Sequence, residues 1–165
     1  MLTKRRVLRR FAAVIVSAVG ELASPAAGHE YLTDLVSPVY QTPGTPRDIA
    51  MRAQTCIAQN LRSGSVNAQQ FVSSDIDHGI IVAQNAITFG SLTVWQARSR
   101  FTFEARDGRF RISQSGIEMF NDMGGGWQPI GKWTGSPWKR AEAAFTATAD
   151  TVAQCVIAGP KKDDW

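Results

Sequence analysis

The sequence has few of the residues from which catalytic and metal centres are usually built. It contains two histidines and two cysteines among 165 residues. A structural zinc site usually needs four close ligands, and the two cysteines do not have the spacing of such a site. No serine lies in a nucleophile-elbow pattern either. From the residues we therefore assign no catalytic residue, no metal site and no cofactor.

One short stretch has the side chains of a weak metal site. Asp75-Ile76-Asp77-His78 brings two carboxylates and one imidazole together between two predicted strands. The alternative is that these are ordinary turn residues, since Asp and Gly are typical of turns. An ordinary turn fits this composition better than a metal site. The other histidine, His29, lies next to the predicted new N-terminus.

The chain also lacks an N-terminal hydrophobic run long enough to span a bilayer. The apolar stretch 11–19 is far shorter than the roughly 20 residues that a spanning helix needs. Basic residues precede it and the small residues 24–28 follow it, which is the order of a secretory signal peptide. We expect residues 1–26 to be removed by cleavage after Ala26, or alternatively after Gly28. The protein is then periplasmic or secreted and has no transmembrane anchor.

The export route itself stays open between two alternatives. Arg5-Arg6 loosely resembles the arginine pair of a twin-arginine signal, which would imply folding before translocation. A simple cluster of positive charge, as in an ordinary Sec-type signal, explains the same residues. We favour the Sec-type signal.

Beyond this segment the sequence has no excess of charge. The whole chain carries a formal charge of +4, but five basic residues and one acidic residue precede position 28. The remainder is formally neutral, so the charge gives no argument for nucleic acid as a partner. Five arginines still gather on two predicted strands: Arg98, Arg100, Arg106, Arg109 and Arg111. They form either an anion-binding face or a solvated face in which Glu104 pairs with Arg111, and we favour the second.

Two helices are indicated by capping signals and apolar spacing. The first opens with Thr45 as N-cap, Pro46 at the first helical position and Asp48 three residues past the cap, and ends at Ser63-Gly64. The second follows Ser136-Pro137 and runs to about residue 158, where Gly159 stops it. Each carries an apolar stripe at a spacing of three and four residues.

Between the helices the apolar period changes to two, which predicts strands over 66–74, 79–84, 91–106 and from residue 109 onward. Asp107-Gly108 is a strong signal for a two-residue hairpin with a type I′ turn. Pairing through that turn places Ala105 opposite Phe110 and Phe103 opposite Ile112, so that all four side chains share one face. A further short strand is expected at 32–36, within an N-terminal segment 27–44.

A glycine-rich connection is expected over 119–135. Its segment 126–132 has the spacing of a phosphate-binding loop, but Trp133 stands where such a loop needs Ser or Thr to hold magnesium, so we reject that function. Trp127 and Trp133 lie in this connection and Trp138 follows it. The three rings either form a contact surface for a ligand or partner, or cover the open end of the core; we favour the second.

These elements predict an α+β domain over 45–158 with a flexible tail at 159–165. Its order β-α-β-β-β-β-α packs most simply as two layers, an antiparallel sheet with both helices on one face. The same order, with the helix opening TPRD, the stretch SSDIDHGIIVAQ and the hairpin ARDGRFRI, resembles a bacterial family of exported domains of unknown function. That resemblance implies a TATA-binding-protein-like (TBP-like) fold, similar in layout to helix-grip proteins, and it implies no activity, cofactor or catalytic residue.

The two cysteines lie on the apolar stripes of the two helices. If the helices pack side by side, Cys56 and Cys155 can meet, and an exported protein works where disulfides persist. The alternative is two separate buried thiols.

Three classes of function remain open. The first is a non-catalytic envelope module that binds a protein or a cell-wall component. The second is a carrier of a small hydrophobic ligand, held between the sheet and the C-terminal helix, and the third is an uncharacterised enzyme. A large apolar pocket under helix 136–158 would favour the carrier, and a filled core would favour the module. Oligomeric state is not predicted.

Overall fold

The computed structural model describes residues 30–64, 69–122 and 124–159. The predicted signal peptide, its cleavage sites, His29 and residues 160–165 of the predicted tail lie outside these ranges. The elements are β1 (Tyr31–Leu32), β2 (Asp34–Val36), β3 (Tyr40–Gln41), α1 (Pro46–Asn60), β4 (Phe71–Asp75), β5 (Ile80–Phe89), β6 (Trp95–Arg106), β7 (Arg109–Asn121), β8 (Gly126–Gly131) and α2 (Trp138–Ala158).

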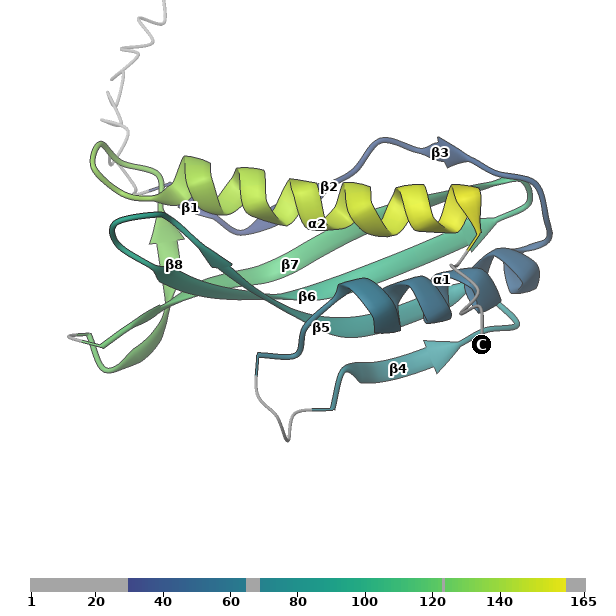
Figure 1. Cartoon of the computed structure of the whole chain (residues 1–165), viewed down its shortest axis with the longest axis horizontal. Coiled ribbons are helices and arrows are strands. Elements are labelled where there is room, and N and C mark those ends of the chain that lie inside the picture. The colour runs from purple at the N-terminus through teal and green to yellow at the C-terminus, as the bar shows by residue number, and fades with distance from the viewer. Residues whose placement is uncertain (1–29, 65–68, 123, 160–165) are drawn as a thin grey trace, which may run out of the picture.

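The strands form one antiparallel sheet in the order β1-β8-β7-β6-β5-β4, and both helices cover the same face of it (Figure 1). The predicted two-layer α+β architecture is therefore confirmed. The short strands β2 and β3 add to β7 beyond the end of β8. The single strand expected at 32–36 is divided in two, because β1 pairs with β8 whereas β2 pairs with β7.

Helix α1 begins as predicted. The Thr45 side chain accepts a hydrogen bond from the Asp48 backbone N–H, and the Asp48 carboxylate accepts one from the Thr45 backbone N–H. The helix ends at Asn60, three residues earlier than predicted. The chain leaves the helix there because Arg62 already lies beside β5. The Arg62 carbonyl accepts a hydrogen bond from the Ala86 backbone N–H, with an N···O distance of 2.7 Å.

The central hairpin has the predicted register, with Ala105 opposite Phe110 and Phe103 opposite Ile112. All four side chains are buried on the helix-covered face. The predicted turn type is wrong, because Gly108 has a positive φ of 69° and Asp107 does not. Two backbone hydrogen bonds explain the difference: Thr42 donates to the Gly108 carbonyl, and Gly108 donates to the Gly44 carbonyl. The turn is thus held by the segment before α1.

The predicted glycine-rich connection over 119–135 is wrong for most of its length. Strand β7 continues to Asn121, and β8 returns antiparallel to it after a short turn. A β-bulge at Gly116 hid this continuation from the sequence pattern: Arg100 pairs with Ser115 but Arg98 with Glu118, so two residues oppose one. Gly116 has a φ of 59°, which suits glycine. Past the bulge the buried side chains shift from even-numbered to odd-numbered positions.

Helix α2 begins later than its sequence signal suggests. Pro137 is the N-cap and makes no side-chain cap, whereas the sequence favoured Ser136 for that position. The Ser136 backbone N–H is used in a turn, where it donates to the Trp133 carbonyl. Within the described residues, no helix is both long and apolar enough to cross a membrane.

Two apolar clusters fill the space between the helices and the sheet. The larger one joins α1 and the C-terminal half of α2 to β5, β6 and β7, and the smaller one lies under the N-terminal half of α2. Between them lies a buried polar group centred on Gln114. Its Oε1 accepts hydrogen bonds from Asn85 Nδ2 (2.8 Å) and Ser99 Oγ (2.9 Å), and its Nε2 donates to the Phe145 carbonyl (2.8 Å).

The predicted disulfide between Cys56 and Cys155 is confirmed. The bond joins α1 to α2, and the two Cα atoms are 5.8 Å apart. Cys56 is fully buried in the larger apolar cluster, and Cys155 packs against that cluster half-buried. The two helices therefore lie side by side, as the shared face of the sheet required.

Candidate functional site

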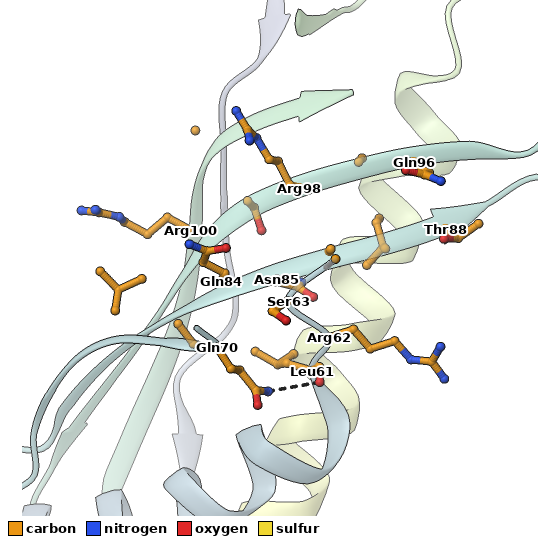
Figure 2. A pocket seen from close by; sticks show the side chains of 18 of the residues that line it. Leu61, Arg62, Ser63, Gln70, Gln84, Asn85, Thr88, Gln96, Arg98 and Arg100 are labelled. Carbon is orange, nitrogen blue, oxygen red and sulfur yellow. Dashed lines mark hydrogen bonds between the residues drawn. The ribbon is translucent and has the colours of Figure 1, made fainter. Parts of the chain in front are cut away.

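A polar groove of about 1140 Å³ lies along β5 and β6, at the edge where β4 and the segment after α1 approach them (Figure 2). The exposed side chains that line it alternate along the strands with buried ones, so they stand on the open face of the sheet, opposite the helices. From β5 these are Gln84 and Thr88 with the half-buried Ala86 between them, and from β6 they are Gln96, Arg98 and Arg100. The groove is also lined by Arg62, Ser63, Gln70 and Trp127. We call this feature the groove.

The edge of the groove is formed because β4 is shorter than β5. Beyond β4, the outward-pointing backbone amides of β5 bond to other segments: Gln84 N–H donates to the Gln70 carbonyl and Ala86 N–H to the Arg62 carbonyl. The Gln70 side chain holds this edge to α1, because its Nε2 donates to the last-turn carbonyls of Ile57 and Leu61 at 2.9 and 3.1 Å. The rim of the groove is thus bonded to β5 on one side and to the end of α1 on the other.

The register places polar side chains of β5 and β6 directly opposite each other. Gln84 is paired with Arg100, Ala86 with Arg98 and Thr88 with Gln96. Side chains at directly opposite positions of an antiparallel pair lie about 5 Å apart at their Cβ atoms. The small Ala86 leaves open space between the longer side chains on either side of it.

The charges that line the groove are all positive. Among its described lining residues there are three arginines and no Asp or Glu. Arg98 is held in place, because it pairs with Glu118 at 2.6 Å and its guanidinium lies 4.4 Å from the centroid of the Trp127 ring. Within the described residues, no ion pair engages Arg62 or Arg100. Figure 2 shows Arg98 and Arg100 extending from β6 and Arg62 from the segment after α1, with Arg62 and Arg100 pointing in opposite directions.

Elsewhere on the open face, the predicted pairing of Glu104 with Arg111 is confirmed. The arginines of β6 and β7 are therefore partly neutralised, as the solvated-face alternative required.

Sequence reasoning missed the groove, which needs Arg62 and Gln70 from segments distant in sequence from β6. The only local signal was the alternation of exposed Arg98 and Arg100 with buried Ala97, Ser99 and Phe101.

The structure does not gather the three tryptophans into one surface. Trp127 lies on the open face, where its ring meets Phe120 edge-on at 5.4 Å. Trp133 lies past the other end of β8, half exposed, over Gly131 and edge-on to Tyr31. Trp138 opens α2 and packs half-buried against the smaller apolar cluster. A contact role for these residues stays a prediction, and Trp127 alone lines the groove.

The turn 75–79 between β4 and β5, which we call the acidic turn, is held by a contact between two of its own side chains and by an ion pair to α1. His78 Nδ1 lies 2.9 Å from Asp75 Oδ1, and Arg47 pairs with Asp77 at 2.6 Å. The hydrogen bond that the His78 ring donates to the Asp75 carboxylate raises the pKa of His78 above its usual value, and the same bond lowers the pKa of Asp75. Within the described ranges, no group of three His, Cys, Asp or Glu is placed to hold a metal ion.

The space that a ligand carrier would use is occupied by side chains. Phe101 and Phe145 are fully buried between the sheet and α2. The buried face of α2 also carries small residues that bring it close to the sheet: Ala141, Ala149 and Ala153. The packing beneath α2 therefore gives no support to the carrier hypothesis.

No family model matches the chain, and no curated protein matches it. Two solved structures are similar to it. A DUF4468 family protein from Bacteroides ovatus is 16% identical with a TM-score of 0.54, covering 80% of this chain and 88% of that one. A TBP-like protein from Parabacteroides distasonis is 10% identical with a TM-score of 0.51, covering 72% and 91%. At such identities the likeness is one of fold: this chain has the TBP-like fold that its sequence resemblance implied.

Proposed function

We propose that this protein is an exported, non-catalytic binding module of the cell envelope, and that the groove is its binding site. The observation that carries the proposal is the composition of the groove. Besides aliphatic side chains, its described lining offers amides, hydroxyls, guanidinium groups and one indole, but no His, Cys, Asp, Glu or Lys that could serve as general base or activated nucleophile. Such a lining can bind and orient a ligand without transforming it.

The rigidity of the groove supports the same proposal. Arg98 is fixed by Glu118 and Trp127, and Gln70 is fixed by the end of α1. Preorganised side chains on paired strands lose less conformational entropy when a ligand binds than side chains on a free loop. The bulge at Gly116 lies beside the groove, and bulges often re-aim side chains at binding sites.

Export is supported by the signal-peptide pattern of residues 1–26 and by the disulfide, because disulfides persist outside the reducing cytosol. The partner is then an envelope protein or a cell-wall component. N-terminal sequencing of protein recovered from the periplasm or the medium should begin at Ala27, or at His29 if cleavage follows Gly28. Recovery of full-length protein from the cytosol alone would contradict export.

The binding site is tested by photo-cross-linking in the envelope. A photoreactive phenylalanine analogue replaces Gln84 in the groove, and a second protein carries it at Gln54, which is exposed on the outer surface of α1. After irradiation of the envelope fraction, we expect adducts from position 84 and few from position 54. Equal yields from both positions, or none from position 84, would contradict the groove as the binding site.

A further inference from the structure

The groove combines positive charge with many polar side chains. Three arginines line it, no carboxylate does so among the described residues, and Glu118 offsets only Arg98. The mature chain as a whole is formally neutral, so this charge is local to the groove. A guanidinium group is suited to carboxylate and phosphate groups, which it binds through two parallel hydrogen bonds. The occupant that complements this lining carries negative charge.

The backbone at the groove edge argues against an extended peptide as the occupant. A peptide that adds to a sheet needs free N–H and C=O groups along an edge strand. Here the outward amides of Gln84 and Ala86 already donate to the carbonyls of Gln70 and Arg62. Strand addition along this half of β5 would have to break both bonds. The groove must recognise its ligand through side chains.

The side chains offered are those that suit hydroxyl groups. Gln84 and Gln96 each present an amide with donors and acceptors, and Thr88 presents a hydroxyl. Sugar hydroxyls also donate and accept, so they can satisfy such groups from either side. Apolar anchors for a folded protein partner are scarce, because Val72 is the one large hydrophobic side chain of the described lining that is exposed. Polar side chains arranged along two strands favour a carbohydrate as the ligand over a hydrophobic protein surface.

We infer that the groove binds an acidic oligosaccharide, whose carboxylate groups are held by Arg100 and Arg62. This inference rests on the proposed binding function of the groove and names its class of ligand. Arg100 is the principal contact, because it lies opposite Gln84 and no ion pair engages it within the described residues. Arg98 contributes less, since Glu118 and Trp127 already occupy its guanidinium. The role of Arg98 is to keep Trp127 in place beside the bound oligosaccharide.

The experiment uses the purified mature protein and three probes: tetragalacturonate, neutral maltotetraose and hexaglutamate. Binding is measured by isothermal titration calorimetry and by chemical-shift changes of backbone amides. We expect tetragalacturonate to bind with shifts confined to β5, β6 and the segment 61–64, and with an affinity that falls as salt is raised. Maltotetraose and hexaglutamate should bind at least about tenfold more weakly.

Two pairs of variants locate the charge effect. Arg100→Gln should weaken tetragalacturonate binding about tenfold, as expected for the loss of one charge-assisted interaction. Its control is Arg106→Gln, which removes another exposed arginine of β6 that lies outside the groove and that no ion pair engages within the described residues. Gln84→Glu adds a carboxylate opposite Arg100 and should abolish binding, while Gln41→Glu adds the same charge on β3, away from the groove. The second pair keeps the test decisive if Arg100→Gln does not fold.

Four results would overturn the inference. Equal binding of maltotetraose would show that charge is not recognised, and equal losses in Arg100→Gln and Arg106→Gln would show only attraction to a basic surface. Preference for hexaglutamate would identify an acidic peptide instead. If no probe binds but cross-links still form at position 84, the glycan inference fails and the binding module stands. If both are absent, the proposed function fails as well.

Discussion

Cys56 on α1 and Cys155 on α2 are joined across 99 positions of sequence, so a single covalent bond ties together almost the whole described domain. Their Cα atoms are 5.8 Å apart, a separation that the packing of the two helices on one sheet face provides. Each cysteine lies on the inner stripe of its helix, which is why the sequence alone predicts the pairing.

Reduction of this disulfide should lower the free energy of unfolding by about 4.7 kcal/mol, the chain-entropy value for a closed loop of about 100 residues. The measurement is guanidinium unfolding of the mature protein with and without reductant. The double variant Cys56→Ala/Cys155→Ala is the control and should not respond to reductant. Two titratable thiols in the denatured, unreduced protein would contradict the bond.

The central hairpin gives a second prediction. Phe103 is fully buried and its ring lies 5.0 Å from that of Phe110. Replacing Phe103 or Phe110 by alanine should destabilise the fold by about 3–5 kcal/mol, because each change removes a large side chain and leaves a cavity.

Its control is Arg100→Ala on the open face of the same hairpin, which should change the free energy of unfolding by less than about 0.5 kcal/mol. Chemical denaturation followed by tryptophan fluorescence measures all three variants. Comparable losses at Phe103 and Arg100 would mean that the strand faces are assigned wrongly.

The acidic turn predicts a pH dependence. The hydrogen bond to Asp75 raises the pKa of His78 above 6.5, so protonated His78 favours the folded state. That contribution is fully present below the unfolded pKa of His78 and is lost as the pH rises through the folded value. Asp75 behaves oppositely: its lowered pKa gives a contribution that is present above its unfolded value and lost in acid.

The pair is therefore strongest between the lowered pKa of Asp75 and the raised pKa of His78. An NMR titration of the His78 ring should give a midpoint above 6.5 in the wild-type protein and a lower one in Asp75→Asn. His78→Gln should cost stability at about pH 5 and little at about pH 9. An unchanged His78 midpoint in Asp75→Asn would show that the contact does not form in solution.

Local signals predicted much of this fold. The capping box of Thr45 and Asp48, the register set at Asp107-Gly108 and the apolar stripes of both helices are each encoded within a few residues, and each is confirmed. The turn type was wrong for a reason that lies elsewhere in the chain: Gly44 accepts the hydrogen bond of Gly108. Such long-range backbone bonds leave no mark on the hairpin sequence.

Strand β8 and the groove could not be predicted for related reasons. The bulge at Gly116 shifts the alternation, so the second half of β7 no longer matches the pattern of its first half. The tryptophans and glycines after it then suggested a loop. The groove depends on Arg62 and Gln70, which reach β5 only because the chain turns back after α1. Arg62 lies at the end of the predicted first helix and Gln70 in the predicted strand 66–74, and neither local pattern places these residues beside β5.

Gln114 carries the last prediction, because it is a buried polar side chain with three partners between two apolar clusters. It accepts hydrogen bonds from Asn85 and Ser99 and donates one to the Phe145 carbonyl, and only 2% of it is exposed. Gln114→Ala leaves the Asn85 amide and the Ser99 hydroxyl buried without this acceptor, whereas the Phe145 carbonyl still belongs to the backbone ladder of α2. Each orphaned buried group costs about 1–3 kcal/mol. Asn85 already has one unpartnered buried atom, Oδ1, so its amide would lose its remaining described bond.

We therefore expect Gln114→Ala to destabilise the protein by about 3 kcal/mol or more, beyond what its lost volume explains. Gln114→Met keeps the length of the side chain but not its hydrogen bonds, and should recover only the packing part of the loss. Gln54→Ala, an exposed glutamine on α1, is the surface control and should change stability by less than about 0.5 kcal/mol. Urea unfolding measures the three variants. Full recovery in Gln114→Met would show that the site is held by volume alone and that the polar group adds nothing to the fold.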